Sequence, residues 1–272
     1  PLKRDSTGSR AAPVGRETAP VLRVVSSLLR TPPQASIWTD WRTHGRCPRE
    51  TVTPAGLTGS MNVSIGLAGA AAGAVAGELI RRRLSGSPYR LGEEVHRATL
   101  GSRPWVTPVA AIAVAALSVA LAPDRWPLLV VAVPVALGGL WLSAVDLDVN
   151  RLPDRVMLPL LAWVMASVVG LGLLTPYVPI LSAFAGGATF GGFLWLLNIA
   201  SAGRLGFGDV KAGALVGLAA GAFSFHVVWW VGMLAFTGAL VASHVPRRRG
   251  SIPLGPFLFA SYVVVATVLG GS

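Results

Sequence analysis

The stretch RLGFGDVKAGALVGLAAG, residues 204–221, places a carboxylate, Asp209, at the start of a long apolar run. Three glycines follow at steps of four residues, ending at Gly221, so they share one helical stripe with the aspartate. Small residues let two helices approach closely inside a membrane. A similar glycine stripe, ending at Gly77, offers one possible partner. The glycines predict a packed membrane helix, but they leave the carboxylate unexplained.

Composition extends this interpretation to the whole chain. Of the 272 residues, 53% are apolar and only 13% are charged, which is too apolar for an ordinary soluble domain. The net charge of +11 comes from basic residues scattered between apolar runs, a pattern that argues against nucleic-acid binding. Most runs approach the roughly 20 residues that a helix needs to cross a bilayer. We predict an all-α, polytopic membrane helix bundle of about eight transmembrane helices, near residues 62–80, 105–122, 127–145, 156–174, 178–199, 207–223, 226–244 and 252–270.

The first 60 residues differ from the rest. They carry nine Lys or Arg and many Pro, Ser and Thr, without a sustained apolar period, so we expect a basic disordered tail. This tail contains no methionine, which leaves open the interpretation that it is not native and that the natural start is Met61. Residues 61–272 are expected to form one membrane-embedded domain.

Charge sets the predicted topology. Loops on one side of the predicted bundle hold thirteen Lys or Arg, and those on the other side hold only Arg125. The basic side should be cytoplasmic, which places both termini outside. Asp146 ends the third run and Asp209 begins the sixth, so two complete spans separate them. Both carboxylates therefore emerge on the same face in either orientation, where they can meet.

A pair of aspartates at this depth has a specific chemical use. Each loses solvation at the membrane interface, and each opposes the ionisation of the other, so the pair tends to share one proton. The charged carboxylate can then activate a water molecule while the protonated one donates to a substrate carbonyl, as in aspartic proteases.

Three segments resemble one known family. GFGD, residues 206–209, matches the GxGD signature of membrane-embedded aspartyl proteases. DLDVNRLPD, residues 146–154, is similar to the D-x-D-x-x-x-x-P-D/N segment of type IV prepilin peptidases, and IPLGPF, residues 252–257, resembles their I-P-F-G-P segment. The segments occur in the family's order, each at a predicted cytoplasmic edge.

The resemblance implies roles for individual residues. Asp146 and Asp209 would be the catalytic pair. The two glycines of GFGD, Gly206 and Gly208, would let the backbone turn tightly beside the scissile peptide. The residues expected to bind substrate or support the site are Gly206, Gly208, Lys211, Pro153 and Asp154. Lys211 could mark the membrane interface or contact an acidic group. Helix capping or solvation in a loop also accounts for Asp148 and Asp154.

The implied function is removal of a basic leader from type IV pilin-like precursors at the cytoplasmic face of a bacterial cytoplasmic membrane. Its partners would be these precursors and membrane lipid, and the chemistry requires no cofactor. The single Cys47 and four dispersed histidines give no support for a metal site. Residues 81–104 are short and lack cysteine, so the chain resembles family members without the cysteine-rich insert, and N-methyltransferase activity is doubtful.

Three alternatives stay open. A secondary transporter could use the same aspartates for proton or cation coupling, but this does not explain the three motifs. Presenilin-like or signal-peptide-peptidase-like proteases share GxGD, but they carry a Y-D motif on the earlier helix and a P-A-L motif near the end. In their place this chain has VD, at Val145 and Asp146, and IPLGP. A non-catalytic membrane scaffold would leave the carboxylates without a role.

Overall fold

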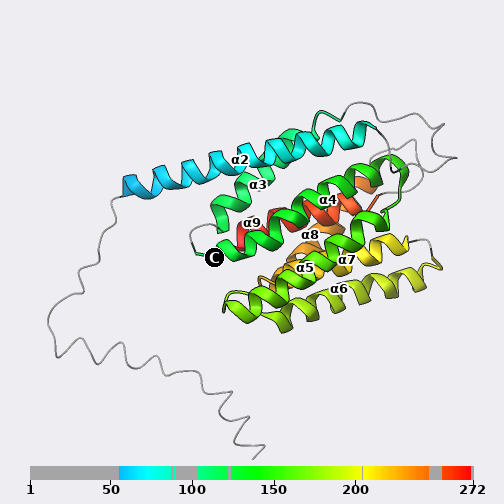
Figure 1. Cartoon of the computed structure of the whole chain (residues 1–272). Helices are drawn as coiled ribbons and strands as arrows, with labels where there is room; N and C mark the ends of the chain where they lie inside the picture. Colours follow the sequence, from blue (N-terminus) through cyan, green and yellow to red (C-terminus); the bar gives the residue numbers. More distant parts are fainter. Residues whose placement is uncertain are drawn as a thin grey trace, which may run out of the picture. The chain divides into compact units, whose positions relative to one another are not determined.

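The computed structural model describes residues 55–86, 89, 103–121, 124–203, 205–244 and 253–270. Eight α-helices and one short 3₁₀ helix occupy these residues, with no strand among them (Figure 1). They are α2 (Ala55–Ser85), α3 (Val106–Leu121), η4 (Trp126–Leu128), α4 (Leu129–Val149), α5 (Asp154–Leu174), α6 (Ile180–Ala200), α7 (Phe207–Gly221), α8 (Phe225–Ser243) and α9 (Gly255–Gly270). The all-α prediction is confirmed, and each expected run corresponds to one helix.

The helices differ in their capacity to cross a membrane. Five segments are long and apolar enough to span a bilayer: Met61–Ser85, Trp126–Val149, Asp154–Leu174, Ile180–Ala200 and Phe225–Ser243. Helices α3 and α9, with 16 residues each, are apolar but shorter, and α7 has 15. At 1.5 Å per residue these three reach roughly 24 Å or less, short of a full hydrocarbon core. The chain is a multi-pass membrane protein with short helices among its longer spans.

The expected tail lies almost wholly outside the described residues, so its character stays a prediction. Helix α2 begins at Ala55, six residues before Met61, and continues through that methionine to Ser85.

Two glycine stripes join helices in pairs, but not in the pairing considered from the sequence. A Cβ added at Gly73 in α2 would come within 2.8 Å of Ala111 Cα in α3, and one added at Gly221 in α7 within 2.8 Å of Ala183 Cα in α6. Figure 1 shows α2 along α3 and α6 along α7. Both stripes permit close packing. The idea that the two stripes face each other is wrong, because each stripe packs against small residues of a different neighbouring helix.

Helices α4, α7 and α9 form the centre of the bundle. Over half of the α4 span is buried, against a third or less in the other four candidate spans. Leu142 of α4, Leu215 of α7 and Tyr262 of α9 are fully buried in one core cluster. In contrast, large apolar side chains such as Leu174 and Leu181 stay more than 80% exposed, as expected of a lipid-facing surface. The two helices that carry the paired aspartates are therefore central elements.

Candidate active site

Asp146 lies in the last turn of α4 and is only 4% exposed. Its Oδ2 accepts a hydrogen bond from the backbone N–H of Gly255, at the start of α9, with an N···O distance of 3.1 Å. Helix α4 ends at Val149, and its C-cap residue, Asn150, adopts a left-handed conformation (φ 52°, ψ 42°) and donates its N–H to the Asp146 carbonyl at 2.9 Å. The start of α9 thus holds the Asp146 carboxylate, and the cap of α4 holds the Asp146 backbone.

Asp209 lies in the first turn of α7 and is partly exposed. Its backbone N–H donates to the carbonyl of Gly206, at 3.0 Å, which closes the first turn of the helix. Gly206 itself is extended (φ −64°, ψ 140°), a conformation open to any residue. The glycine is not needed there for a positive φ.

At Gly208 the backbone packs tightly against a neighbouring side chain. A Cβ at this position would lie 3.2 Å from the Cβ of Leu152, in the loop that joins α4 to α5. The start of α7 therefore packs closely on that loop. The sequence-based reason for the two motif glycines, a tight backbone turn, is not what the structure shows at either position.

The two aspartates come together at one end of the bundle. Helices α4 and α7 are in contact, and the Asp209 carboxylate is near enough to Asp146 to act on it electrostatically. The Asp146 carboxylate is buried and accepts a hydrogen bond from a backbone N–H, whereas Asp209 is partly exposed. Two carboxyl groups in such proximity can hold one proton between them, and so can act as an acid and a base on the same substrate.

Lys211 and Asp154 pair with each other. The Lys211 Nζ lies 2.7 and 2.8 Å from the two Asp154 carboxylate oxygens, and 5.3 Å from the centroid of the Phe207 ring. The side chain of Asp154 is 55% exposed. Pro153 is the N-cap of α5, and its carbonyl accepts the N–H groups of Val156 and Met157. The Lys211–Asp154 ion pair therefore joins the start of α5 to the start of α7.

Asp148 is neither a helix cap nor a solvated loop residue, in contrast to the interpretation from sequence. It is 4% exposed, and its Oδ2 accepts a hydrogen bond from the Tyr89 hydroxyl at 2.8 Å and lies 3.3 Å from Nη2 of buried Arg103. The same Nη2 donates to the Tyr89 oxygen at 2.7 Å. Two residues along a helix turn a side chain by about 200°. Asp148 therefore anchors the side of α4 opposite to Asp146.

Sequence reasoning did not single out Gly255, which contacts Asp146, or Tyr89 and Arg103, which hold Asp148 on the opposite side of α4. Gly255 stood inside the quoted IPLGPF motif, but nothing in that motif indicated a contact with Asp146. Tyr89 and Arg103 belong to an interval with the composition of an ordinary basic loop. Within the described part of the chain, no group of three or more His, Cys, Asp or Glu could hold a metal ion.

The long apolar helices define a multi-pass membrane protein, and the family match described next places it among the aspartic peptidases. Residues 133–270, just over half of the chain, match the model of the type IV leader peptidase family, and the chain belongs to that family. The matched region contains Asp146, Asp209 and Gly255, and begins within α4, so α2 and α3 lie outside it. Searches of curated proteins and of solved structures find no significant match.

Proposed function

We propose that this protein is an aspartic endopeptidase that removes the leader peptide from type IV pilin-like precursors, with Asp146 and Asp209 as its catalytic residues. The observation that carries the proposal is the meeting of two carboxylates, one from the end of α4 and one from the start of α7. Family membership supports the reaction class.

In the proposed reaction, the charged carboxylate accepts a proton from a water molecule, whose oxygen attacks the carbonyl carbon of the scissile peptide bond. The protonated carboxyl group donates to the carbonyl oxygen. When the C–N bond breaks, the leaving nitrogen takes up a proton from one carboxyl group, while a hydroxyl group of the tetrahedral intermediate returns a proton to the other carboxylate as the product carbonyl forms. The pair then again holds one proton. The partial exposure of Asp209 gives a route for the water and the peptide.

The substrate class fits the membrane position of the pair. A pilin-like precursor presents a basic, hydrophilic leader followed by an apolar helix, so its scissile bond lies at a membrane surface. Thirteen Lys or Arg lie on the side of the predicted topology that holds both aspartates, which supports cleavage at the cytoplasmic face of a bacterial cytoplasmic membrane.

Methylation of the new N-terminus is not part of the proposed activity. The interval from Arg81 to Pro104 contains no cysteine and too few residues for a separate cofactor-binding domain. Mature product made by this protein with S-adenosylmethionine present should therefore keep an unmodified N-terminal amine. A methyl mass increment that depends on this protein would contradict this part of the proposal.

The test is cleavage of a pilin-like precursor by the purified protein in detergent, followed by mass measurement of both products. Detergent removes the transmembrane gradient, so a peptidase stays active, whereas a coupled transporter has no gradient to use and hydrolyses no peptide bond. Release of an intact leader supports the proposal. An unchanged precursor, together with ion movement by the same protein in sealed vesicles, would favour the transporter.

A further inference from the structure

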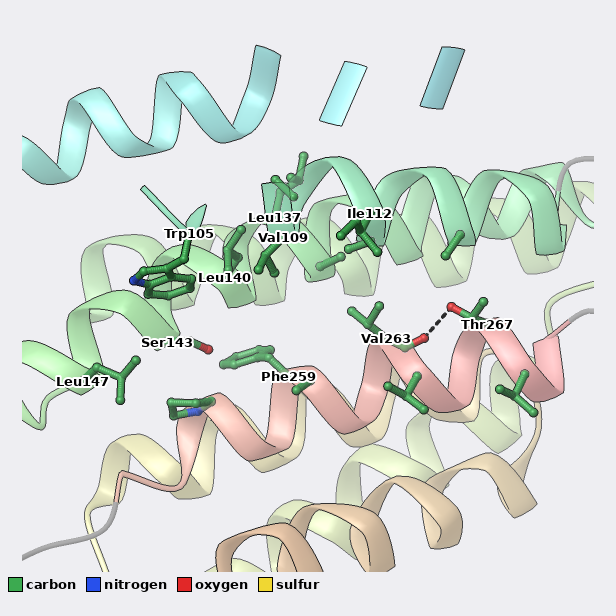
Figure 2. Close-up of a pocket in the computed structure, with 18 residues that line it drawn as sticks. Trp105, Val109, Ile112, Leu137, Leu140, Ser143, Leu147, Phe259, Val263 and Thr267 are labelled. Atoms are coloured by element: carbon green, nitrogen blue, oxygen red, sulfur yellow. Dashed lines mark hydrogen bonds between the residues drawn. The ribbon is translucent and has the colours of Figure 1, made fainter. Parts of the chain in front are cut away.

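An apolar groove runs between α3, α4 and α9, with a volume of about 550 Å³. Figure 2 shows Val109 and Ile112 of α3 on one wall and Phe259 and Val263 of α9 on the other, with α4 contributing Leu140. The hydroxyl of Thr267, one of the few polar groups in the groove, donates to the Val263 carbonyl at 2.6 Å. The lining therefore suits an apolar occupant.

One end of this groove adjoins the candidate active site. Ser143 and Leu147 line it from α4, one turn before Asp146 and directly after it. Pro256 lines it from α9 and directly follows Gly255, whose N–H binds Asp146. Figure 2 shows Leu147 and Ser143 toward one end and Thr267 toward the other. Groove-lining residues therefore neighbour Asp146 along α4 and Gly255 along α9, although neither Asp146 nor Asp209 itself lines the groove.

The groove has the length of several helical turns. Its lining residues on α9 run from Pro256 to Val268, which is roughly 18 Å at 1.5 Å per residue. Alanines on both walls, including Ala113 of α3 and Ala260 of α9, leave room for another helix to approach closely. Ile112 and Val268 are each 69% exposed, so the groove is open at its side instead of being closed within the bundle.

A second apolar cavity, of about 370 Å³, provides a comparison. It lies between α6 and α8, where Phe190, Phe193 and Trp229 line it. Neither Asp146, Asp209 nor any residue next to them in sequence takes part. An apolar lining is therefore common to both cavities, and the first one differs in being lined by Leu147 and Pro256, which directly follow Asp146 and Gly255.

We infer that the groove between α3, α4 and α9 binds the apolar helix of the precursor and so delivers the preceding peptide bond to Asp146. The inference rests on the proposed function, because only a substrate with an apolar helix beside its cleavage site needs both features at once. A lipid chain could fill the same volume, but it would gain nothing from the adjoining carboxylate.

Groove-filling variants test the inference. Ala113→Phe and Ala260→Phe each place a ring in the groove from a different wall, whereas Ala166→Phe places the same ring on the exposed surface of α5, away from it. For a full-length precursor we expect each groove variant to raise KM about tenfold or more, with kcat within about twofold of the parent. The Ala166→Phe control should keep both constants. A parental KM in both groove variants would overturn the inference and leave lipid as the occupant.

A crosslinking measurement separates this inference from the proposed function and from failures of folding. A photoreactive residue at Ile112, in the groove, is compared with one at Leu181, 84% exposed on α6 and outside it. Binding does not require cleavage, so an uncleaved precursor that crosslinks at Ile112 supports the groove even if the peptidase proposal fails. Equal crosslinking at the two positions overturns the inference that the groove binds the precursor helix, even if the precursor is cleaved.

Discussion

Substitution of Gly255 by alanine should impair cleavage by displacing the Asp146 carboxylate. A Cβ at this position would lie 2.8 Å from Asp146 Oδ2 and 3.4 Å from its Cγ. Ordinary contact begins near 3.4 Å, so the oxygen must retreat by about 0.6 Å, and the 3.1 Å hydrogen bond from the Gly255 N–H lengthens beyond its normal range. A hydrogen bond to a charged group contributes about 1.5–3 kcal/mol, which corresponds to a roughly 10- to 100-fold loss of kcat/KM.

The assay is the initial rate of precursor cleavage by the purified variant, with its thermal unfolding midpoint measured in parallel. Gly170→Ala in α5 is the matched control, because a Cβ there would meet nothing within 4 Å. We expect the control to cleave at the parental rate and Gly255→Ala to keep a similar unfolding midpoint. Parental cleavage by folded Gly255→Ala would show that the contact with Asp146 does not matter for the reaction.

Three further outcomes are expected. Asp154→Asn should keep cleavage within about threefold of the parent, because an exposed ion pair contributes only about 0.2–1 kcal/mol; complete inactivity would make Asp154 the catalytic carboxylate of its segment. Arg103→Met should lower the free energy of unfolding by about 3–5 kcal/mol, since it removes one buried partner of the buried Asp148 carboxylate; an unchanged unfolding midpoint would contradict this. Chelators should leave the cleavage rate unchanged, whereas loss of activity restored by a divalent ion would indicate a metallopeptidase.

The helices were predictable because their hydropathy and their length both follow from one requirement, that a helix must cross an apolar bilayer. Each apolar run has a helix, and the count of spans between Asp146 and Asp209 places both at one end of the bundle. The boundaries were less predictable. The third run was expected to end near residue 145, but α4 continues to Val149, because Asp146 and Asp148 are stabilised by contacts that hydropathy does not record.

The supporting contacts depend on packing between distant segments. Gly255 meets Asp146 across 109 residues of sequence, and Tyr89 meets Asp148 across 59. A motif identifies which residues are unusual, but not which neighbour each one contacts. The glycine stripes show the same limit: their spacing predicted close packing, whereas the choice of partner followed from the arrangement of the whole bundle.

The decisive measurement is the cleavage rate of Asp146→Asn and Asp209→Asn, each purified and shown to be folded by its thermal unfolding midpoint. An asparagine keeps nearly the same volume but cannot exchange a proton as a carboxyl group does, so the loss of acid–base catalysis should be about 100-fold or greater in each variant. We expect both proteins to leave the precursor uncut under conditions in which the parent cleaves it completely. Cleavage at the parental rate by either folded variant would contradict the paired-aspartate mechanism.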